Sequence, residues 1–364
     1  MNAGKLKVFR IYDFAHEVKI EEAEEKLKKL GPTSKYKLQK DSKDFLIGDP
    51  PLVLTLGEVL IGHSSCHILI KIWSYGAISF SLTFSCDSFT NQKDFIQWMR
   101  VSSDNLAIDD FCLKKLAELN PLLGSSLKKQ NTWKQEEDYS IFIANPDFKP
   151  REFWEKDNFV YQLLTMEDSV ALSPEMIAPI KASSLSYGPN DLVVIDWDNA
   201  FVLAKQDSED ICDVIELANV QLLELRFFDD LLDKKLSGLY RQVVERKPTL
   251  FNSTISLLAQ DASQLYMETS EVVERIENSL KIVGDIYFAR IYRISLSRLQ
   301  VPQWQGTVDQ KLKNLLDISQ MYIGELHTKR SHFMEIIIII LIAIEVVPFL
   351  YPHVIKLINL IRWV

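Results

Sequence analysis

Cysteine, glycine and histidine are scarce in this sequence, with 4, 12 and 6 copies among 364 residues. The cysteines are widely scattered, and none has the paired spacing of a zinc site or of a disulfide framework; they are Cys66, Cys86, Cys112 and Cys212. The glycines are dispersed, so the sequence lacks a glycine-rich loop that could hold a phosphate. We therefore expect reduced core cysteines, no metal and no cofactor.

An excess of basic residues is also lacking. The formal net charge is -9 and the sequence pI is about 5.3. Proteins that grip nucleic acid need dense lysine and arginine to neutralise phosphates, so we expect no direct DNA binding. A local basic surface formed by Lys128, Lys129 and Lys134 keeps RNA or ribosome binding open as an alternative.

The N-terminus lacks the pattern of a targeting segment. Its first residues, MNAGKLKVFRIYDF, pass from two lysines straight into the alternating pattern of a strand. A secretory signal would have an apolar core in this region, and a transit peptide would be rich in arginine and serine. We predict no cleavable targeting segment.

One long hydrophobic run is present near the C-terminus. Phe333 to Tyr351 reads FMEIIIIILIAIEVVPFLY, which is close to the ~20 residues that cross a bilayer core. A buried core helix is rarely apolar around its whole circumference, and Lys329 and Arg330 give the run a basic collar. We predict a single transmembrane anchor over residues 333–351, with most of the chain in the cytosol or an equivalent compartment.

Two acids interrupt this run. Glu335 lies near its start, where a carboxylate can reach the interface, whereas Glu345 would lie ~18 Å inside the span at 1.5 Å per residue. A carboxylate at such depth costs about 2.5 kcal/mol or more on insertion scales. Either Glu345 marks the far end of a short span, or it faces protein through self-association or pairing with another membrane protein.

The last residues, 352–364, place polar side chains among apolar ones in the pattern HVIKLINLIRWV after Pro352. This pattern predicts an interfacial amphipathic helix, with Trp363 at the lipid headgroups and with Lys356 and Arg362 in contact with the membrane surface. A second partial span is the alternative. Basic residues lie on both flanks of the anchor, so they do not decide on which side the tail ends.

The first 205 residues alternate strand and helix patterns. Strands are predicted over Lys7–Phe14, Leu52–Ile61, His67–Ser74, Ala77–Phe84 and Tyr139–Ala144, and helices over Ile20–Leu30, Asp94–Leu119 and Phe153–Glu167. Leu192–Asp196 and Ala200–Ala204 flank the turn-forming residues Trp197, Asp198 and Asn199, which predicts a hairpin. We predict an α+β sandwich with one helical layer over residues 1–205.

Helical spacing takes over in residues 206–332. A first helix is predicted from Asp207 to about Lys247, before Pro248, and a second over Ile255–Leu299. The second carries a coiled-coil seam with a stutter, and a third helix follows Pro302. We predict a long antiparallel helical, coiled-coil stalk that leads into the C-terminal transmembrane helix.

Few residues suggest chemistry. His63, Cys66 and His67 lie close together, but no second ligand pair accompanies them, so we assign no metal site. Asp196 and Asp198 could hold a cation, although a hairpin turn explains the same residues. No nucleophile stands in a recognisable elbow, and we assign no catalytic residue.

Four features of the sequence point to one family: EDSVALSPE from Glu167 to Glu175, LELRFFDDLLDKKL from Leu223 to Leu236, the long helix followed by Trp304 and VDQKLKNLLDI, and EIIIIILIAIEV with an acid near each end. In these segments the chain resembles the family required for meiotic nuclear division. That family includes a mitochondrial inner-membrane protein that supports translation, and it has bacterial relatives. The resemblance implies a membrane-tethered scaffold that forms homo-oligomers, without catalytic residues to carry across.

The sequence therefore predicts a non-enzymatic, C-terminally anchored scaffold that oligomerises and recruits a soluble partner, which could be ribosome-associated. The expected location is the bacterial inner membrane, or the mitochondrial inner membrane by the resemblance, with the head domain in the cytoplasm or matrix. The alternative is a membrane-bound enzyme or small-ligand sensor that uses the α+β head, with Asp196, Asp198 or His63 at its pocket.

Overall fold

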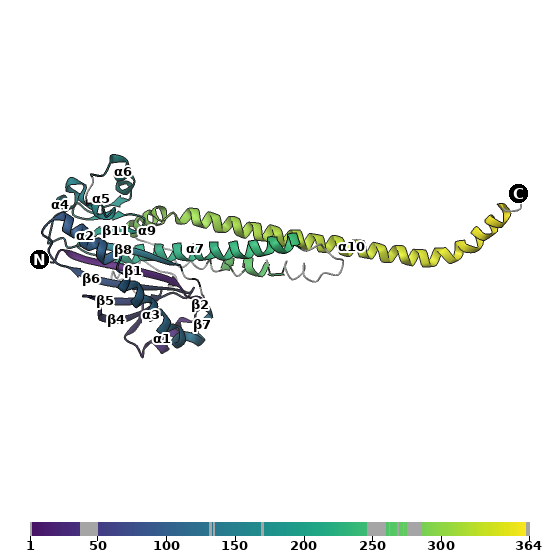
Figure 1. The fold of residues 1–364 in the computed structure, drawn as a ribbon, viewed down its shortest axis with the longest axis horizontal. Helices are drawn as coiled ribbons and strands as arrows, with labels where there is room; N and C mark the ends of the chain where they lie inside the picture. The colour runs from purple at the N-terminus through teal and green to yellow at the C-terminus, as the bar shows by residue number, and fades with distance from the viewer. Residues whose placement is uncertain are drawn as a thin grey trace. The chain divides into compact units, whose positions relative to one another are not determined.

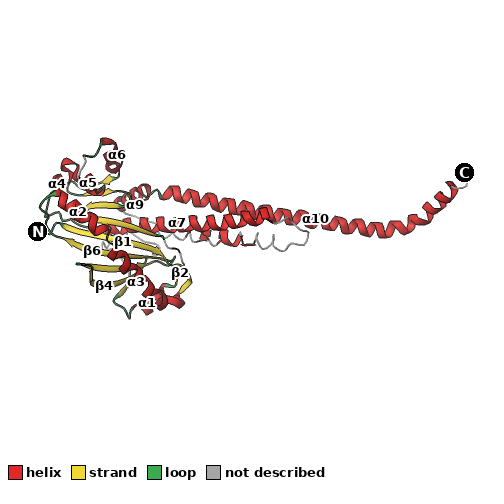
Figure 2. Cartoon of the chain, in the orientation of Figure 1, coloured by secondary structure: helices red, strands yellow, loops and turns green. Residues whose placement is uncertain are grey.

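The computed structural model describes residues 2–36, 50–130, 133, 135–168, 171–245, 260–261, 263–267, 269–271, 273–274 and 286–361. The chain divides into two compact units, Met1–Leu231 with Glu271–Val308, and Leu232–Ser270 with Asp309–Val364. Among the described residues the strands all belong to the first unit, as the yellow arrows of Figure 2 show. The first unit is therefore the head domain.

The head is built on a mixed sheet of nine strands. In spatial order these are β3 (Thr33–Lys35), β4 (Leu52–Ile61), β5 (Ser64–Ile72), β6 (Ala77–Cys86), β1 (Gly4–Asp13), β8 (Glu136–Ala144), β11 (Asn199–Leu203), β10 (Leu192–Ile195) and β9 (Ser184–Leu185) (Figure 1). Neighbours are antiparallel except β8 and β11, which run parallel. A separate pair joins β2 (Ala15–Val18) and β7 (Leu127–Gln130).

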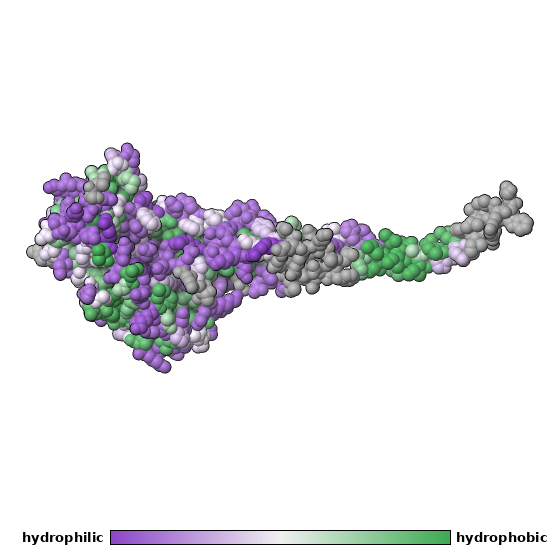
Figure 3. All heavy atoms as spheres, in the orientation of Figure 1, coloured by the Kyte–Doolittle hydropathy of each residue, from purple (hydrophilic) through white to green (hydrophobic). Residues whose placement is uncertain are grey.

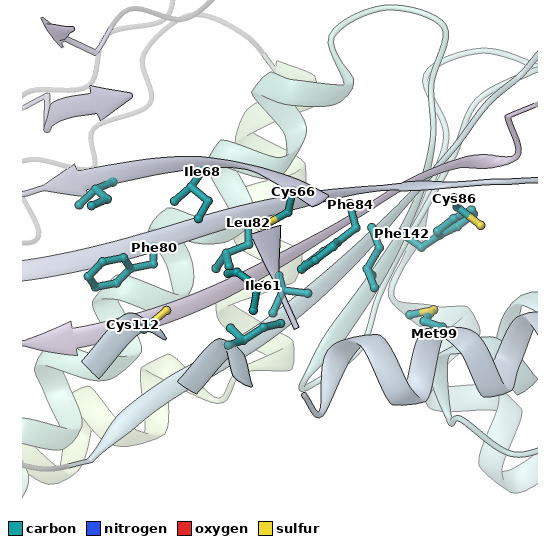
Figure 4. Close-up of a cluster of buried hydrophobic side chains, with 14 of the residues drawn as sticks. Ile61, Cys66, Ile68, Phe80, Leu82, Phe84, Cys86, Met99, Cys112 and Phe142 are labelled. Atoms are coloured by element: carbon teal, nitrogen blue, oxygen red, sulfur yellow. The ribbon is translucent and has the colours of Figure 1, made fainter. Parts of the chain in front are cut away.

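One face of this sheet is apolar. Alternation along β6 sends Ile78, Phe80, Leu82 and Phe84 to the same side, where they join the main hydrophobic core. Figure 4 shows this packing, with Met99 and Phe142 among the labelled side chains. The core also takes residues from α1 (Ile20–Leu27), α2 (Gln92–Ser103), α3 (Leu106–Leu123), α4 (Arg151–Glu155), α5 (Phe159–Leu164) and α6 (Pro174–Ala182). Short 3-10 turns lie at Gly124–Ser126 and Lys156–Asn158.

The opposite face of the sheet carries polar residues as well as apolar ones such as Phe9 and Ile141, and it lies under helix α7 (Ser208–Glu245). The intervening residues of the same strands, such as Ser79 and Ser81 of β6, point to this side and are buried. Helix α9 (Ile286–Arg298) packs next to α7, since the Tyr292 hydroxyl donates a hydrogen bond to Gln221 Oε1 at 2.7 Å. The predicted α+β class is confirmed, but the prediction of one helical layer is wrong because α7 covers the second face.

Two predicted helices of the head are interrupted. The Asp94–Leu119 pattern contains both α2 and α3, because the side chain of Asn105 accepts a hydrogen bond from the Ala107 N–H and begins a new helix. The Phe153–Glu167 pattern contains α4 and α5, because Asp157 and Asn158 take left-handed backbone conformations between them. Helical spacing continues across both breaks, so spacing alone did not locate them.

Helix α10 (Val301–Ile361) is one continuous helix of 61 residues, which corresponds to ~90 Å at 1.5 Å per residue. Pro302 lies in its first turn, where a proline costs no hydrogen bond. The helix continues through Pro348 and Pro352, so the separate tail helix predicted after Pro352 is instead part of α10.

The predicted stalk is described only in part. The helix from Asp207 is confirmed as α7. Within the predicted Ile255–Leu299 helix, the described residues between 260 and 274 are helical and α9 forms the last part, whereas residues 255–259 and 275–285 lie outside the described residues. Within the second unit, Lys311 Nζ of α10 lies 2.6 Å from Asp233 Oδ1 of α7. The first unit includes α7 up to Leu231, beyond the residue 205 at which the predicted head ends.

Candidate membrane anchor and buried charge network

The C-terminal part of α10 carries the longest apolar surface of the described chain. Residues His327–Pro348 form a helical stretch of 22 residues that is long and apolar enough to cross a membrane, and none of it is buried. Figure 3 shows a green band along most of this part of α10, after the hydrophilic residues at its start. Exposed isoleucine and leucine side chains at this density are unfavourable in water, because each would gain about 1.5–3 kcal/mol on burial. The stretch overlaps the predicted anchor at 333–351.

The residues predicted to contact the membrane lie along this stretch. Lys329 and Arg330 are in its first turn, and Glu335 Oε2 lies 3.3 Å from His332 Nδ1. Glu345 precedes the end of the stretch by three residues, and α10 continues after it through residues 346–361. Lys356 lies within α10, whereas Arg362 and Trp363 lie outside the described residues.

A second concentration of charge is buried between the sheet and α7. Glu209, Asp213 and Glu216 follow one another at helical spacings of four and three, so they share the α7 face that meets the sheet. Lys7 of β1 pairs with Glu209, and Lys71 of β5 pairs with Glu216 and with Asp213 at 2.7 Å. The Tyr36 hydroxyl donates a hydrogen bond to Asp213.

The lysine at the centre of this network is 4% exposed. Burial works to lower the pKa of Lys71, but Asp213 and Glu216 together hold it above its usual value. Burial likewise works to raise the pKa of Asp213, and Lys71 and Lys7 hold it below its usual value. Both partners are therefore charged, and each satisfies the other. Such a network fixes the position of α7 on the sheet, and its charged groups are engaged with one another.

The other end of the α7 contact holds two carboxyl groups with raised pKa values. Burial and the nearby Asp13 carboxyl raise the pKa of Glu224 well above its ordinary range. Burial raises the pKa of Glu137 on β8 to about 7, although Arg226 of α7 pairs with it and works in the opposite direction. Glu137 and Glu224 therefore keep their protons to a higher pH than ordinary glutamates do.

The β10–β11 hairpin presents an exposed aromatic side chain at its tip. Trp197 is 68% exposed, whereas its neighbour Asp196 is buried. Asp196 Oδ1 accepts a hydrogen bond from Arg298 Nε of α9 at 2.9 Å. Burial and the adjacent Asp196 raise the pKa of Asp198 to about 6. Asp196 therefore holds the arginine of a neighbouring helix, and the predicted hairpin is confirmed as β10 and β11.

The residues predicted for an enzyme pocket do not meet. His63 lies in the turn between β4 and β5, whereas Asp196 follows β10, and the strands β6, β1, β8 and β11 lie between β5 and β10 in the sheet. A cavity of about 440 Å³ lies at the junction of β2 and α1, and charged residues including Glu17, Glu21 and Lys35 line it. Neither His63 nor the two aspartates of the hairpin line that cavity.

The cysteines and the histidines near them are not arranged to hold a metal. Cys66 points into the apolar core, so strand alternation sends the next residue, His67, to the other face of the sheet. Within the described ranges, no group of three or more histidine, cysteine or acidic residues could hold a metal ion. Cys66, Cys86, Cys112 and Cys212 are free and buried, and burial raises the pKa of the Cys66 and Cys86 thiols to about 11 and about 12.

The predicted basic surface is only partly described. Lys128 Nζ lies 2.9 Å from Glu17 Oε2 across the β2–β7 pair, so its charge is partly balanced. Lys129 lies beside it in β7, and Lys134 lies outside the described residues. The described part of this surface therefore carries less positive charge than the sequence indicates.

Sequence analysis did not identify the network under the sheet. Lys7 and Lys71 each occur on a strand in which apolar residues alternate with others, which is the pattern of a lysine in water. The acids at positions 209, 213 and 216 were the available signal, because their common helical face also borders buried apolar residues. A helix that is buried on every side must pair any charges it carries.

Residues 3–209 match the family described as "Uncharacterized protein MJ0711, N-terminal domain". The relative named "Uncharacterized protein MJ0711", from Methanocaldococcus jannaschii, is 28% identical over 263 residues, which cover 68% of this chain and 80% of the relative. No solved structure matches the chain. The findings support a family without a characterised function, and they do not support the predicted resemblance to the family required for meiotic nuclear division.

Proposed function

The chain belongs to the family of the uncharacterized protein MJ0711, whose N-terminal domain covers residues 3–209, and from this premise we propose that it is a non-enzymatic membrane tether. In this proposal α10 anchors the chain in a bilayer, and the head domain recruits a soluble partner. The observation that carries the proposal is the exposed apolar stretch His327–Pro348, because lipid is the surrounding that matches a helix apolar on all sides.

The charges of the head support a binding role over a catalytic one. Lys7, Lys71 and Arg298 are each engaged by carboxylates of α7 or of the hairpin. A catalytic acid or base must instead reach a substrate in a cavity. Among the described residues that line the cavity at the β2–α1 junction, no group of histidine, cysteine or acidic side chains could hold a metal ion.

We place the tether in the cytoplasmic membrane, with the head in the cytoplasm. Four free, buried cysteines suit a reducing compartment, where thiols stay unpaired. Support for a mitochondrial address came from the meiotic nuclear division resemblance, which the comparisons do not carry. A link to translation or to the ribosome remains one form that the soluble partner could take.

Association between copies of the chain forms the second part of the proposal. The coiled-coil seam in the sequence from Ile255 to Leu299 and the Glu345 carboxyl within α10 both favour helix pairing. A carboxyl group in lipid is costly unless another helix provides a hydrogen bond or a counter-charge. Glu345 would therefore stabilise an association of anchors in the membrane.

Protease protection and crosslinking of the full chain in native membranes test both parts. Protease added to intact inside-out vesicles should digest the head and leave a protected fragment that contains residues 333–351. Crosslinking in right-side-out membranes should give oligomers of the chain. The Glu345→Leu variant should give a lower yield of these oligomers, and the control variant Ile344→Leu should give the same yield as the wild type. Release of the full chain from the membrane by a carbonate wash would contradict the proposal. Crosslinking that yields only monomers, with no stable partner, would also contradict it.

A further inference from the structure

The tether hypothesis requires a surface on the head for its soluble partner, and the tip of the β10–β11 hairpin has the properties of such a surface. Trp197 at this tip is 68% exposed. Tryptophan is among the side chains that most often dominate the binding energy of an interface, because it buries a large apolar area with few rotatable bonds. An isolated exposed tryptophan is unremarkable on its own, so its support and its surroundings decide its role.

The support of Trp197 is rigid. The Trp197 N–H donates a hydrogen bond to Asp196 Oδ1 at 2.8 Å, and Arg298 Nε donates to the same oxygen at 2.9 Å. The buried Tyr139 hydroxyl makes hydrogen bonds to the carbonyl oxygens of Asp196 and Asn199, at 2.9 Å and 2.7 Å. The turn is thus fixed at both of its ends. A side chain on such a support loses little conformational freedom when it binds.

The surroundings of Trp197 are acidic. The Ser140 N–H donates a hydrogen bond to the Asp198 carbonyl oxygen at 3.1 Å, which brings Asp138, two residues earlier on β8, to the same end of the sheet. Asp138 pairs in register with Arg10 of β1, whose guanidinium donates to Asp109 and to the carbonyl oxygen of Ser103. Asp104 follows directly after Ser103 at the end of α2.

The basic groups at this end are already engaged. Arg298 is held by Asp196, and Arg10 by Asp109, whereas Asp104, Asp138 and Asp198 form no ion pair among the residues that the structure describes. Three carboxylates at the end of the sheet that carries this exposed indole repel an anionic surface such as a lipid headgroup layer, and they disfavour an uncharged apolar partner whose contact would desolvate them. They suit a cation, which an indole face also attracts.

We propose that the Trp197 tip is the docking site for a basic segment of the partner protein, with an arginine or lysine side chain stacked on the indole and with Asp138 and Asp198 as its counter-charges. This inference rests on the recruiting role proposed above and names the chemistry of the recruited partner. The proposed site recognises a long, positively charged side chain. A peptide with arginines spaced by small residues is therefore the appropriate probe.

The test uses the full chain in detergent micelles and a fluorescein-labelled peptide of alternating glycine and arginine. Fluorescence anisotropy should give saturable binding that Trp197→Ala weakens about ten-fold, which is the scale of a partly desolvated cation–π contact. Trp197→Phe should retain most of the affinity, and Trp197→Leu should lose nearly as much as Trp197→Ala. Tyr187→Ala is the matched control, because Tyr187 is 79% exposed and lies before the other end of β10.

Non-specific attraction to the acidic chain is separated by charge. Trp197→Ala leaves the net charge unchanged, so equal binding by this variant and the wild type would overturn the inference, as would a wild type that does not bind. Asp138→Asn with Asp198→Asn should weaken binding and reduce its salt dependence. Flotation of Trp197→Ala with membranes should equal that of the wild type, so failure of the docking site and failure of the membrane tether give different results.

Discussion

The head and the end of α10 each reverse the usual distribution of side chains. Under α7 the head buries Lys7, Lys71 and Glu216, whereas α10 exposes a continuous set of aliphatic side chains between His327 and Pro348. The buried charges of the head find partners inside the same unit. None of the stretch of α10 from His327 to Pro348 is buried. The head therefore satisfies these charges internally, whereas the end of α10 leaves its apolar side chains exposed.

The largest expected effect concerns the exposed helix end. Ile339→Arg with Ile340→Arg should abolish membrane association, because two arginines near the middle of a span oppose insertion by about 5 kcal/mol or more. The head should stay folded, since both side chains are exposed and belong to the second unit. Sedimentation of membranes after a carbonate wash measures the effect, and Ile339→Leu with Ile340→Leu is the control. Retention of the arginine variant in the membrane would show that the end of α10 is not inserted in the bilayer, so it would contradict the proposed difference between α10 and the head.

The next effect concerns the buried lysine of the head. Lys71→Met should lower the free energy of unfolding by about 3–5 kcal/mol, because Asp213 and Glu216 would remain buried without their cation. Thermal unfolding followed by circular dichroism measures the change. Adding Asp213→Asn and Glu216→Gln should restore part of the loss. A melting temperature unchanged by Lys71→Met would show that the network is solvated and does not hold α7.

A smaller effect is expected from proton binding at the other end of α7. The folded chain holds the Glu137 proton up to about pH 7, whereas an ordinary glutamate releases it near 4.5. Its contribution to stability is therefore full below about pH 4.5 and is lost as the pH rises to about 7, by about 3 kcal/mol. Glu137→Gln should flatten this part of the stability curve in urea titrations. Identical pH slopes for the variant and wild type would contradict the assignment.

The smallest effect is expected on the surface of the head. Lys115 Nζ lies 2.7 Å from Glu118 Oε2 on the exposed side of α3. Lys115→Met should change the free energy of unfolding by less than about 1 kcal/mol, because water screens an exposed pair. This variant is the matched control for Lys71→Met in the same unfolding measurement. A change as large as that of the buried lysine would show that burial does not separate the two classes of ion pair.

Much of the fold could be predicted where a local pattern determines the structure. Two-residue alternation located most strands, and the turn residues at 197–199 located the β10–β11 hairpin. The parallel pairing of β8 with β11 could not be predicted, because it joins segments about 60 residues apart through side-chain packing. Helix breaks such as the one at Asn105 depend on a single capping side chain, which helical spacing does not reveal.

The candidate sites also differ in whether a local pattern in the sequence reveals them. The apolar stretch of α10 was visible in the sequence, because its signal lies in consecutive residues. The network around Lys71 was not visible, since its partner Asp213 is 142 residues away and each residue alone has the pattern of a solvated charge. The acidic surroundings of Trp197 likewise depend on three separate elements that only the folded sheet brings together.

Cysteine accessibility along α10 in intact inside-out vesicles, which expose the cytoplasmic head to the reagent, tests most directly whether this helix end lies in lipid. The four native cysteines are buried, so labelling by a membrane-impermeant maleimide reports on an introduced cysteine. Ser237→Cys on the exposed side of α7 should label rapidly, whereas Ile339→Cys should stay unlabelled until detergent is added. Equal labelling of both positions in intact membranes would contradict a membrane anchor.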